Sequence, residues 1–352
     1  MKYGRKYFSG WIKMKLKVVK EKFEFLNPMK NMERDTQIIE YREDPLTGTT
    51  CIFNPATAEK AKIFYGSTDR EALRKFAEKT KESCFFCPEK LETSAARFLE
   101  FENLKRGEAV LFPNLYAAFH DSVVIVLTKK HFLDLNEFTP EIFENGISLG
   151  LKYLEKRFKE KKIEYGVLGG NYLPQAGASI VHPHMHVLSS KVPFRVLKRM
   201  IENSEKYHRE NGVNIIDDIL KERDRYIGKF GSMELYTPFA PLGNNEIDGV
   251  IRKRSLLELK ENDIKDISHL LTEVLKFYYE EGLSSFNFMI YSGALNGKDN
   301  LYCGIKIISR QNFKQYYTND IWYLLKILQE SLIFESPEET AKKFREVLKR
   351  RK

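Results

Sequence analysis

The sequence predicts an α+β fold built from two tandem copies of one structural unit. A β-branched run at 122–128 is typical of a buried strand. From Thr139 to about Lys161, apolar residues recur at helical spacing, with Thr139 as the N-cap. The order strand, long helix, strand, polar loop, strand then occurs again in the second half. We interpret this recurrence as an internal duplication; the alternative is a coincidence of common α+β patterns.

Local patterns predict the other elements of the first copy. Residues 41–48 read as a turn rich in Asp, Pro, Thr and Gly, followed by a short β-rich run through Phe53. A polar helix is expected at 69–81. Further strands are expected at 109–114, 165–171 and 180–189. Each repeat is therefore expected to form an antiparallel sheet with helices packed on it.

The second copy resembles the first more weakly. A strand-like segment at 250–254 precedes a helix at about 261–281, and strands follow at 286–291 and 301–309. The last segment, 336–351, has the pattern of an amphipathic, highly charged helix that packs on the surface.

These patterns divide the chain into three parts. Residues 35–195 form the first copy and 196–352 the second. Residues 1–34 form a basic N-terminal extension, either a disordered arm or an artefact of the choice of start site, because Met29 and Met32 lie just before the first recognisable folded segment. We expect the extension to contribute little to the core.

Composition and charge exclude several classes of protein. With 42% hydrophobic and 13% aromatic residues, a chain of 352 residues predicts a folded protein rather than a disordered one. The net charge of +9 is spread along the chain, which favours a solvated surface over a nucleic-acid groove. Neither an apolar run of roughly 20 residues nor a secretory signal is present, so we expect a cytoplasmic protein without a membrane span.

The four cysteines are Cys51, Cys84, Cys87 and Cys303. Without an export signal a disulfide framework is not expected. The close pair Cys84/Cys87 has the spacing of a metal-binding knuckle.

Three of the seven histidines lie within five positions, at His182, His184 and His186. In an extended strand, side chains two residues apart share a face, so the three imidazoles are predicted to line one side. Surface histidines on a strand and a three-histidine metal site are the alternatives. A third ligand at i+4 is usually too distant in a strand, which favours nucleophilic chemistry.

The pattern His-x-His-x-His followed by two apolar residues resembles that of the histidine-triad superfamily. The wider context is similar to the galactose-1-phosphate uridylyltransferase-like branch, over about residues 40–190. The blocks that carry this likeness are Asp44-Pro-Leu-Thr-Gly48, Cys84-Phe-Phe-Cys87, Phe112-Pro-Asn-Leu-Tyr-Ala-Ala118, Lys130-His131, Asn171, Gly177-Ala-Ser179 and His182-Pro-His184. The resemblance implies a fold of two tandem histidine-triad-like repeats, the second lacking the catalytic histidines.

The resemblance also implies catalytic roles. His184 occupies the position of the nucleophile that forms a covalent nucleotidyl-histidine. Asn171 orients the nucleophile and phosphate, Ser179 and the backbone of Gly177 and Ala178 hold phosphate oxygens, and His186 donates to the phosphate or the leaving group.

Other matched positions imply contacts with the nucleotide. Phe112, Pro113 and Asn114 match the segment that approaches base and ribose, with core packing as the alternative for Phe112 and Pro113. Arg42 is expected to add a phosphate contact.

A structural zinc site follows from the same resemblance. Its four ligands are Cys84, Cys87, His131 and His182, a set that suits the tetrahedral N/S preference of Zn²⁺. Because His182 precedes the nucleophile by two residues, the metal would fix the aim of His184.

The sequence departs from the family pattern at three places, one of which is the region after Arg310, where the family's residues that grip the hexose phosphate are not matched. Uridylyltransferases have glutamine where this chain has His186, and histidine there is the pattern of hydrolytic histidine-triad proteins. In the second copy, residues 301–306 lack the paired histidines that bind a second metal in some members.

Three functions remain open from sequence. The first is a nucleotidyltransferase that moves a nucleoside monophosphate from a nucleotide sugar to a sugar phosphate. The second is a hydrolase or phosphorylase of nucleotide sugars or dinucleoside polyphosphates, with water or phosphate as acceptor. The third is a non-catalytic zinc module that binds nucleic acid, which the combination of Asn171, Ser179 and His184 argues against. The family's usual arrangement implies a homodimer.

Overall fold

A ten-stranded antiparallel sheet forms the centre of the computed structural model, which describes residues 14, 16–58, 66–119, 121–314 and 320–351. Its strands in the first half are β4 (Leu104–Arg106), β5 (Ala109–Pro113), β6 (Asp121–Val126), β7 (Tyr165–Tyr172) and β8 (His184–Ser190). Those in the second half are β9 (Tyr226–Phe230), β10 (Met233–Tyr236), β11 (Ile247–Ile251), β12 (Phe286–Tyr291) and β13 (Cys303–Ser309).

The strand order shows the duplication directly. From edge to edge it is β4-β5-β6-β8-β7-β12-β13-β11-β10-β9. Counted from the opposite edge, the strands of the second half follow the same order as those of the first, with β9 to β13 in the places of β4 to β8. β7 and β12 pair in the middle, with Asn171 opposite Asn287. The expected α+β fold of two tandem repeats is confirmed, and the repeats share one continuous sheet.

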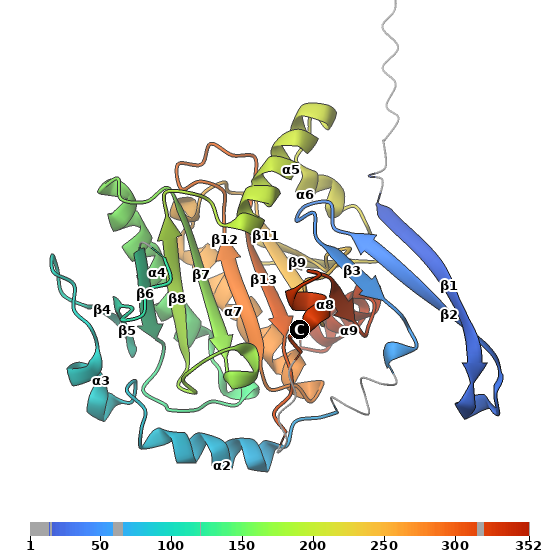
Figure 1. The fold of residues 1–352 in the computed structure, drawn as a ribbon. Coiled ribbons are helices and arrows are strands. Elements are labelled where there is room, and N and C mark those ends of the chain that lie inside the picture. Colours follow the sequence, from blue (N-terminus) through green and yellow to red (C-terminus); the bar gives the residue numbers. More distant parts are fainter. Residues whose placement is uncertain (1–13, 15, 59–65, 120, 315–319, 352) are drawn as a thin grey trace, which may run out of the picture.

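Helices α4 (Pro140–Lys159) and α7 (Glu261–Glu280) lie side by side behind the large sheet in the view of Figure 1. The other helices are α2 (Arg70–Lys81), α3 (Pro88–Ser94), α5 (Arg195–Asn211), α6 (Ile215–Ile219), α8 (Tyr323–Lys326) and α9 (Pro337–Arg350). Short 3-10 turns are η1 (Pro28–Lys30), η2 (Leu135–Glu137), η3 (Pro174–Ala176) and η4 (Leu256–Glu258). The helices expected at 69–81, 139–161, 261–281 and 336–351 are all present.

The main core lies between one face of the sheet and the paired helices α4 and α7. Met185 and Val187 of β8 point into this core and are fully buried. Two glycines allow α4 to approach the strands closely, because a Cβ at Gly146 or Gly150 would lie 2.3 or 2.6 Å from a leucine side chain. By strand alternation, His184 and His186 lie on the opposite face.

A smaller sheet is formed by three strands from the N-terminal region and one from the C-terminal region of the described chain. It consists of β1 (Lys17–Asn27), β2 (Glu33–Glu43), β3 (Thr50–Phe53) and β14 (Ser331–Ile333), in the order β1-β2-β3-β14. β14 runs parallel to β3, and the other pairs are antiparallel.

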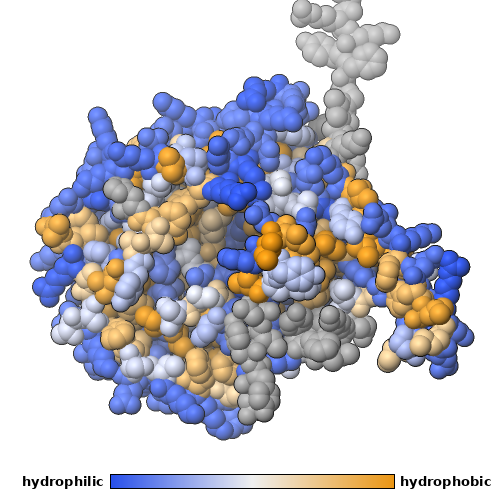
Figure 2. All heavy atoms as spheres, in the orientation of Figure 1, coloured by the Kyte–Doolittle hydropathy of each residue, from blue (hydrophilic) through white to orange (hydrophobic). Residues whose placement is uncertain are grey.

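β1 and β2 form a long hairpin that projects from the body (Figure 1). Apolar side chains lie exposed along it (Figure 2), with Val19 and Phe23 each more than half accessible. The expected N-terminal extension therefore contains strand β1, while its residues 1–13 and 15 lie outside the described part. Met14 is buried in a cluster with residues of α5 and α6, so this end of the chain does contact the body. None of the helices described here has the length and apolar character of a membrane span.

Candidate active site and metal centre

Strand β8 begins at His184, four residues later than the expected strand at 180–189. Pro183 accounts for the difference, because proline cannot donate a ladder hydrogen bond. Its carbonyl still accepts from Leu127 N at 3.0 Å, which anchors the chain at the start of the strand. His182 therefore lies in the preceding bend, and the three imidazoles do not all line one strand face as predicted.

His184 and His186 share the sheet face opposite α4. Their register partners on β6 are Val126 and Val124. The two imidazole rings are 5.2 Å apart and nearly perpendicular. Phe86 packs edge-on against His184, with the ring centroids 5.3 Å apart.

A backbone contact fixes the tautomer of His184. Its Nδ1 lies 2.7 Å from the carbonyl oxygen of His182. A carbonyl only accepts, so Nδ1 carries the proton and Nε2 keeps its lone pair. Burial lowers the pKa of His184, which keeps this ring neutral near pH 7. These are the conditions that a nucleophilic imidazole requires.

His186 is also held neutral. Burial, with a further contribution from His184, lowers the pKa of His186 to about 4. Its ring can therefore present one donor nitrogen and one acceptor nitrogen near pH 7.

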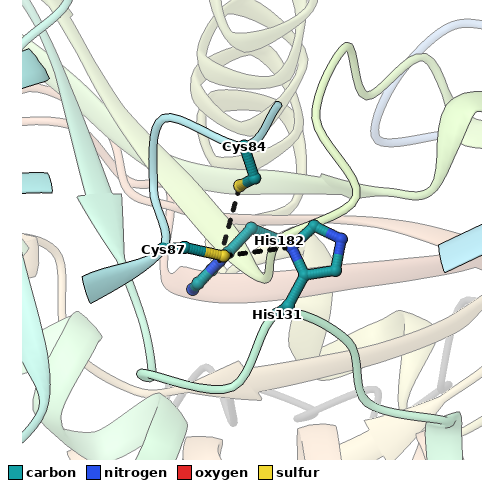
Figure 3. A group of neighbouring side chains, drawn as sticks. All are labelled: Cys84, Cys87, His131 and His182. Carbon is teal, nitrogen blue, oxygen red and sulfur yellow. Dashed lines mark hydrogen bonds between the residues drawn. The ribbon is translucent and has the colours of Figure 1, made fainter. Parts of the chain in front are cut away.

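The four expected metal ligands converge on one point (Figure 3). Cys84, Cys87, His131 and His182 are all buried, and their ligand atoms lie within 4.8 Å of one another. Sγ of Cys87 is 3.4 Å from Nδ1 of His131 and 3.7 Å from Nδ1 of His182. Tetrahedral Zn²⁺ with two sulfur and two nitrogen ligands implies N···S separations of about 3.5 Å. The cluster can therefore hold a metal ion.

The protonation states also suit a metal. Nε2 of His131 and of His182 donate to the carbonyl oxygens of Ala77 and Thr128, which leaves both Nδ1 atoms free for the cluster. Burial lowers the pKa of both imidazoles, that of His182 to about 4. Burial and the adjacent Cys84 raise the pKa of Cys87 to about 12, so two thiolates here require a compensating cation.

Asn171 lies on the same face as the histidines. In the β7–β8 ladder Gly169 is opposite His186. Asn171 follows Gly169 by two residues and His184 precedes His186 by two, so by alternation the side chains of Asn171, His184 and His186 lie on the same face.

The loop after β7 differs from expectation at its backbone. The amides of Gly177 and Ala178 were expected to hold phosphate, but they donate to the carbonyls of Pro174 and Leu173. These bonds close η3, and Gly177 follows with φ +90°, a value that favours glycine. Ser179 is exposed and remains the expected phosphate contact of this loop.

Arg42 is also placed differently from expectation. Its guanidinium is buried in the small sheet, with Nη1 3.0 Å from both carboxylate oxygens of Glu338 and Nη2 2.8 Å from Glu40. These ion pairs occupy the donors that were expected to contact phosphate.

The residues expected to contact the nucleotide lie at the end of β5 and directly after it. Phe112 is buried against Phe86, with ring centroids 5.8 Å apart, which fits its alternative role in packing. Pro113 is half-buried, and Asn114 donates to Ser122 Oγ at 3.4 Å while accepting from Tyr116 N. Phe86 was not assigned a role from sequence, although its place between the two cysteines was a usable signal.

The second repeat contributes side chains that the sequence did not reveal. Asn287 contacts Asn171, and Arg310 contacts Asn287. Arg310 also forms two hydrogen bonds with Asp320, and both residues line a cavity of about 780 Å³. No local sequence signal marks Asn287, because its partner belongs to the other repeat.

In place of histidines, the second repeat has a buried ion cluster. Lys306 of β13 lies on the same sheet face as His184 and contacts Glu246 at 3.0 Å and Asp248 at 2.6 Å. The two carboxylates raise the pKa of Lys306 above its ordinary value despite burial. Strand β13 itself contains no histidine.

Sequence comparison identifies one clear relative. No protein-family model matches the chain. An uncharacterized protein of Archaeoglobus fulgidus is 32% identical over 320 residues, which cover 89% of this chain and 93% of that protein. The chain belongs to the family of this archaeal protein.

Solved structures define the fold. An ADP-glucose phosphorylase from Arabidopsis thaliana superposes with a TM-score of 0.69 at 19% identity, covering 88% of this chain and 99% of that chain. A galactose-1-phosphate uridylyltransferase-like protein of the same plant also gives 0.69 at 19% identity, covering 87% and 98%. A uridylyltransferase mutant gives 0.64 at 17% identity, covering 89% and 99%. The chain therefore has the same fold as these uridylyltransferase and phosphorylase structures.

Proposed function

We propose that the protein is a nucleotidyltransferase that takes a nucleoside monophosphate from a nucleotide sugar onto His184. The observation that carries this proposal is the Nδ1 hydrogen bond of His184, which leaves Nε2 unprotonated on the face shared with Asn171 and His186. The fold shared with uridylyltransferases and ADP-glucose phosphorylase supports the same chemistry.

The reaction divides into two displacements. In the first, Nε2 of His184 attacks the α-phosphorus, a P–N bond forms, and the P–O bond to the sugar phosphate breaks. In the second, an oxygen of the acceptor phosphate attacks the same phosphorus and releases neutral His184. Asn171 and Ser179 stabilise the phosphate oxygens in both steps, and His186 donates to the departing or entering oxygen.

We further propose that the metal is Zn²⁺ and that its role is positional. It would be held by Cys84, Cys87, His131 and His182, a closed set without an open coordination position. Fixing His182 fixes the carbonyl that holds the His184 ring, and so the direction of Nε2.

The preferred acceptor is a sugar phosphate. Inorganic phosphate is the second candidate, favoured by the likeness to ADP-glucose phosphorylase and by histidine rather than glutamine at His186. With phosphate, the nucleotidyl group would leave as a nucleoside diphosphate. We propose a cytoplasmic protein, and a homodimer by analogy with the family.

The test is a trapped intermediate. We expect the protein, given UDP-glucose or ADP-glucose without acceptor, to gain the mass of one nucleoside monophosphate at His184, read by intact and peptide mass spectrometry. His184→Ala should abolish both adduct and turnover, with metal content unchanged. Normal turnover by His184→Ala, or an adduct on His182, would show that the mechanism is wrong.

A further inference from the structure

The two repeats meet at a pair of asparagines beside the proposed phosphate site. Asn171 of β7 and Asn287 of β12 are register partners in the middle of the ten-stranded sheet. Nδ2 of Asn287 lies 2.6 Å from Oδ1 of Asn171. Both side chains are half-buried, so neither amide is free to rotate as it would in water.

Two neighbours determine the orientation of the Asn287 amide. Its Nδ2 is 2.9 Å from the carbonyl oxygen of Ala176, which can only accept. Its Oδ1 is 2.5 Å from Nη1 of Arg310, which can only donate. Arg310 is held in turn by two hydrogen bonds to Asp320. The assignment of O and N in Asn287 therefore follows from chemistry at both ends.

This orientation passes to Asn171. Nδ2 of Asn287 donates one hydrogen to Ala176 and the other to Asn171, so the atom of Asn171 that it contacts must be Oδ1. The Asn171 amide is thereby turned so that its own Nδ2 points elsewhere. No other protein group in the described part of the chain accepts from that Nδ2, which leaves two hydrogens for a ligand oxygen.

The contact with Ala176 acts on the loop that carries Ser179. This loop begins at Leu173, whose φ of +68° lies in the left-handed region that non-glycine residues avoid. Such a conformation costs on the order of 1–3 kcal/mol and persists only where surrounding contacts hold it. Asn287 provides one of these contacts from the other repeat.

We propose that Asn287 is a positioning residue: it orients the Asn171 amide to donate to the phosphate of the nucleotide and holds the loop of Ala176 against β7. The second repeat, although it lacks the catalytic histidines, then supplies part of the active-site geometry. This inference rests on the proposed function, because Asn171 is assigned to the phosphate there.

Asn287→Asp provides the sharpest test. A carboxylate cannot donate, so it loses the bonds to Asn171 Oδ1 and Ala176 while keeping the one from Arg310. Asn171 would turn its Nδ2 towards the new carboxylate and present Oδ1 to the phosphate. Loss of one well-placed donor lowers rates by about 10²–10³-fold, so we expect adduct formation on His184 to slow by at least about tenfold.

The control is Asn103→Asp. Asn103 is likewise half-buried and donates to a backbone carbonyl at 2.9 Å, that of Ala96, away from the site. We expect it to form the adduct at the wild-type rate. Both variants should keep the wild-type metal content and lose similar, small amounts of thermal stability.

A double-mutant cycle separates positioning from simple stability. In an Asn171→Ala background, Asn287→Asp should lower the adduct rate by clearly less than it does in the wild-type background, because the part that acts through Asn171 is already lost and only the contact with Ala176 remains. A full additional loss, or a wild-type adduct rate in folded Asn287→Asp, would overturn the inference while leaving the proposed function intact. If Asn287→Asp fails to fold, Asn287→Ser, which keeps one donor, takes its place in the cycle.

A binding measurement keeps the test independent of turnover. Calorimetric titration with UDP and with ADP should show at least tenfold weaker binding to Asn287→Asp than to Asn103→Asp. Equal affinities would contradict the inference. Absence of any adduct in the wild-type protein, with nucleotide binding still sensitive to Asn287→Asp, would remove the proposed reaction but keep the positioning role.

Discussion

At the scale of single residues, the site depends on imidazoles with fixed tautomers. His182 donates from Nε2 to Thr128, which leaves Nδ1 for the metal cluster, whereas His184 donates from Nδ1 to His182, which leaves the lone pair on Nε2. Each backbone carbonyl thus selects which nitrogen of the ring keeps its lone pair. The sequence singled out these histidines, but only the fold shows which nitrogen of each is available.

His186 should control the fate of the intermediate. An imidazole can carry a proton between leaving group and acceptor, which an amide cannot. We expect His186→Gln to keep the nucleotidyl adduct, slow its hydrolysis by about tenfold or more, and raise the share transferred to a sugar phosphate. Single-turnover decay of the adduct, with and without acceptor, measures both effects. If wild type and variant transfer the nucleotidyl group to water and to the sugar phosphate in the same ratio, the reason for suspecting hydrolysis is removed.

The residue-level predictions from sequence were uneven for physical reasons. Metal ligands are restricted to a few residue types, so the four that converge in the structure, Cys84, Cys87, His131 and His182, could be grouped from the sequence. The Gly177 amide was misassigned because whether a turn amide points inward or outward depends on how the turn closes. Arg42 was misassigned because its partner Glu338 lies far along the chain, on α9.

At the scale of elements, the metal cluster ties together three segments distant in sequence. Cys84 follows α2, Cys87 is the N-cap of α3, and the two histidines precede η2 and β8. Metal binding should therefore contribute strongly to folding. A bound ion would join the ends of α2 and α3 to the sheet.

Cys84→Ser should lose metal and stability together. We expect metal content to fall from about one ion per chain to a small fraction, and Tm to drop by about 10 °C or more. Elemental analysis and calorimetry measure these. Cys51→Ser is the matched control, since Cys51 is equally buried but lies in β3, away from the cluster. A Cys84→Ser/Cys87→Ser protein with a full complement of metal would contradict the site.

Elements whose apolar residues recur at regular spacing were predicted well, whereas the exposed strand β1 was not. Helix α4 has its apolar residues at helical spacing and a capping position at Thr139, and it begins and ends within two residues of expectation. The hairpin strand β1 was missed because it is exposed along most of its length and therefore has no alternating buried face.

At the scale of the whole molecule, the two repeats differ in what fills the same sheet face. The first carries the histidines, and the second carries Lys306 paired with Glu246 and Asp248. Removing one member of a buried ion cluster leaves uncompensated charge. The cluster should therefore support the second repeat only while all three members are present.

Lys306→Met should destabilise the protein by about 3–5 kcal/mol at pH 7. Burial raises the pKa of Asp248, and without the lysine this carboxyl binds a proton in the folded state at a higher pH than when unfolded. The free-energy cost of burying the Asp248 carboxylate therefore grows as pH rises above the pKa of this group in the unfolded chain, and it disappears below that pKa. We expect the deficit to shrink as pH falls towards about 4, measured by urea unfolding. Adding Asp248→Asn should recover part of the loss at pH 7, and no recovery would exclude this explanation.

A chain that begins at Met32 tests how far the hairpin supports the body. β1 faces solvent on most residues, whereas Met14 is buried against α5 and α6. We expect the shortened chain to fold and retain metal, with Tm lower by only a few degrees. A chain that begins at Lys17 separates the loss of Met14 from the loss of β1. Failure of the Met32 chain to fold would show that the hairpin is part of the core structure.

The duplication was visible in sequence, but the way the repeats join was not. Which strands pair across the junction depends on contacts between residues more than 100 positions apart, such as Asn171 and Asn287. Local patterns carry no information about such pairs.

The parallel pairing of β3 with β14 has a consequence for synthesis of the chain. Cys51 is paired with Ser331, so the small sheet joins segments 280 residues apart. During translation β1, β2 and β3 emerge well before β14, so the edge of β3 that β14 covers stays open until residues 331–333 have left the ribosome. Closure of this edge is a late event with a large entropic cost. An open strand edge is a site for association with other nascent chains, so the risk of aggregation is concentrated in this interval.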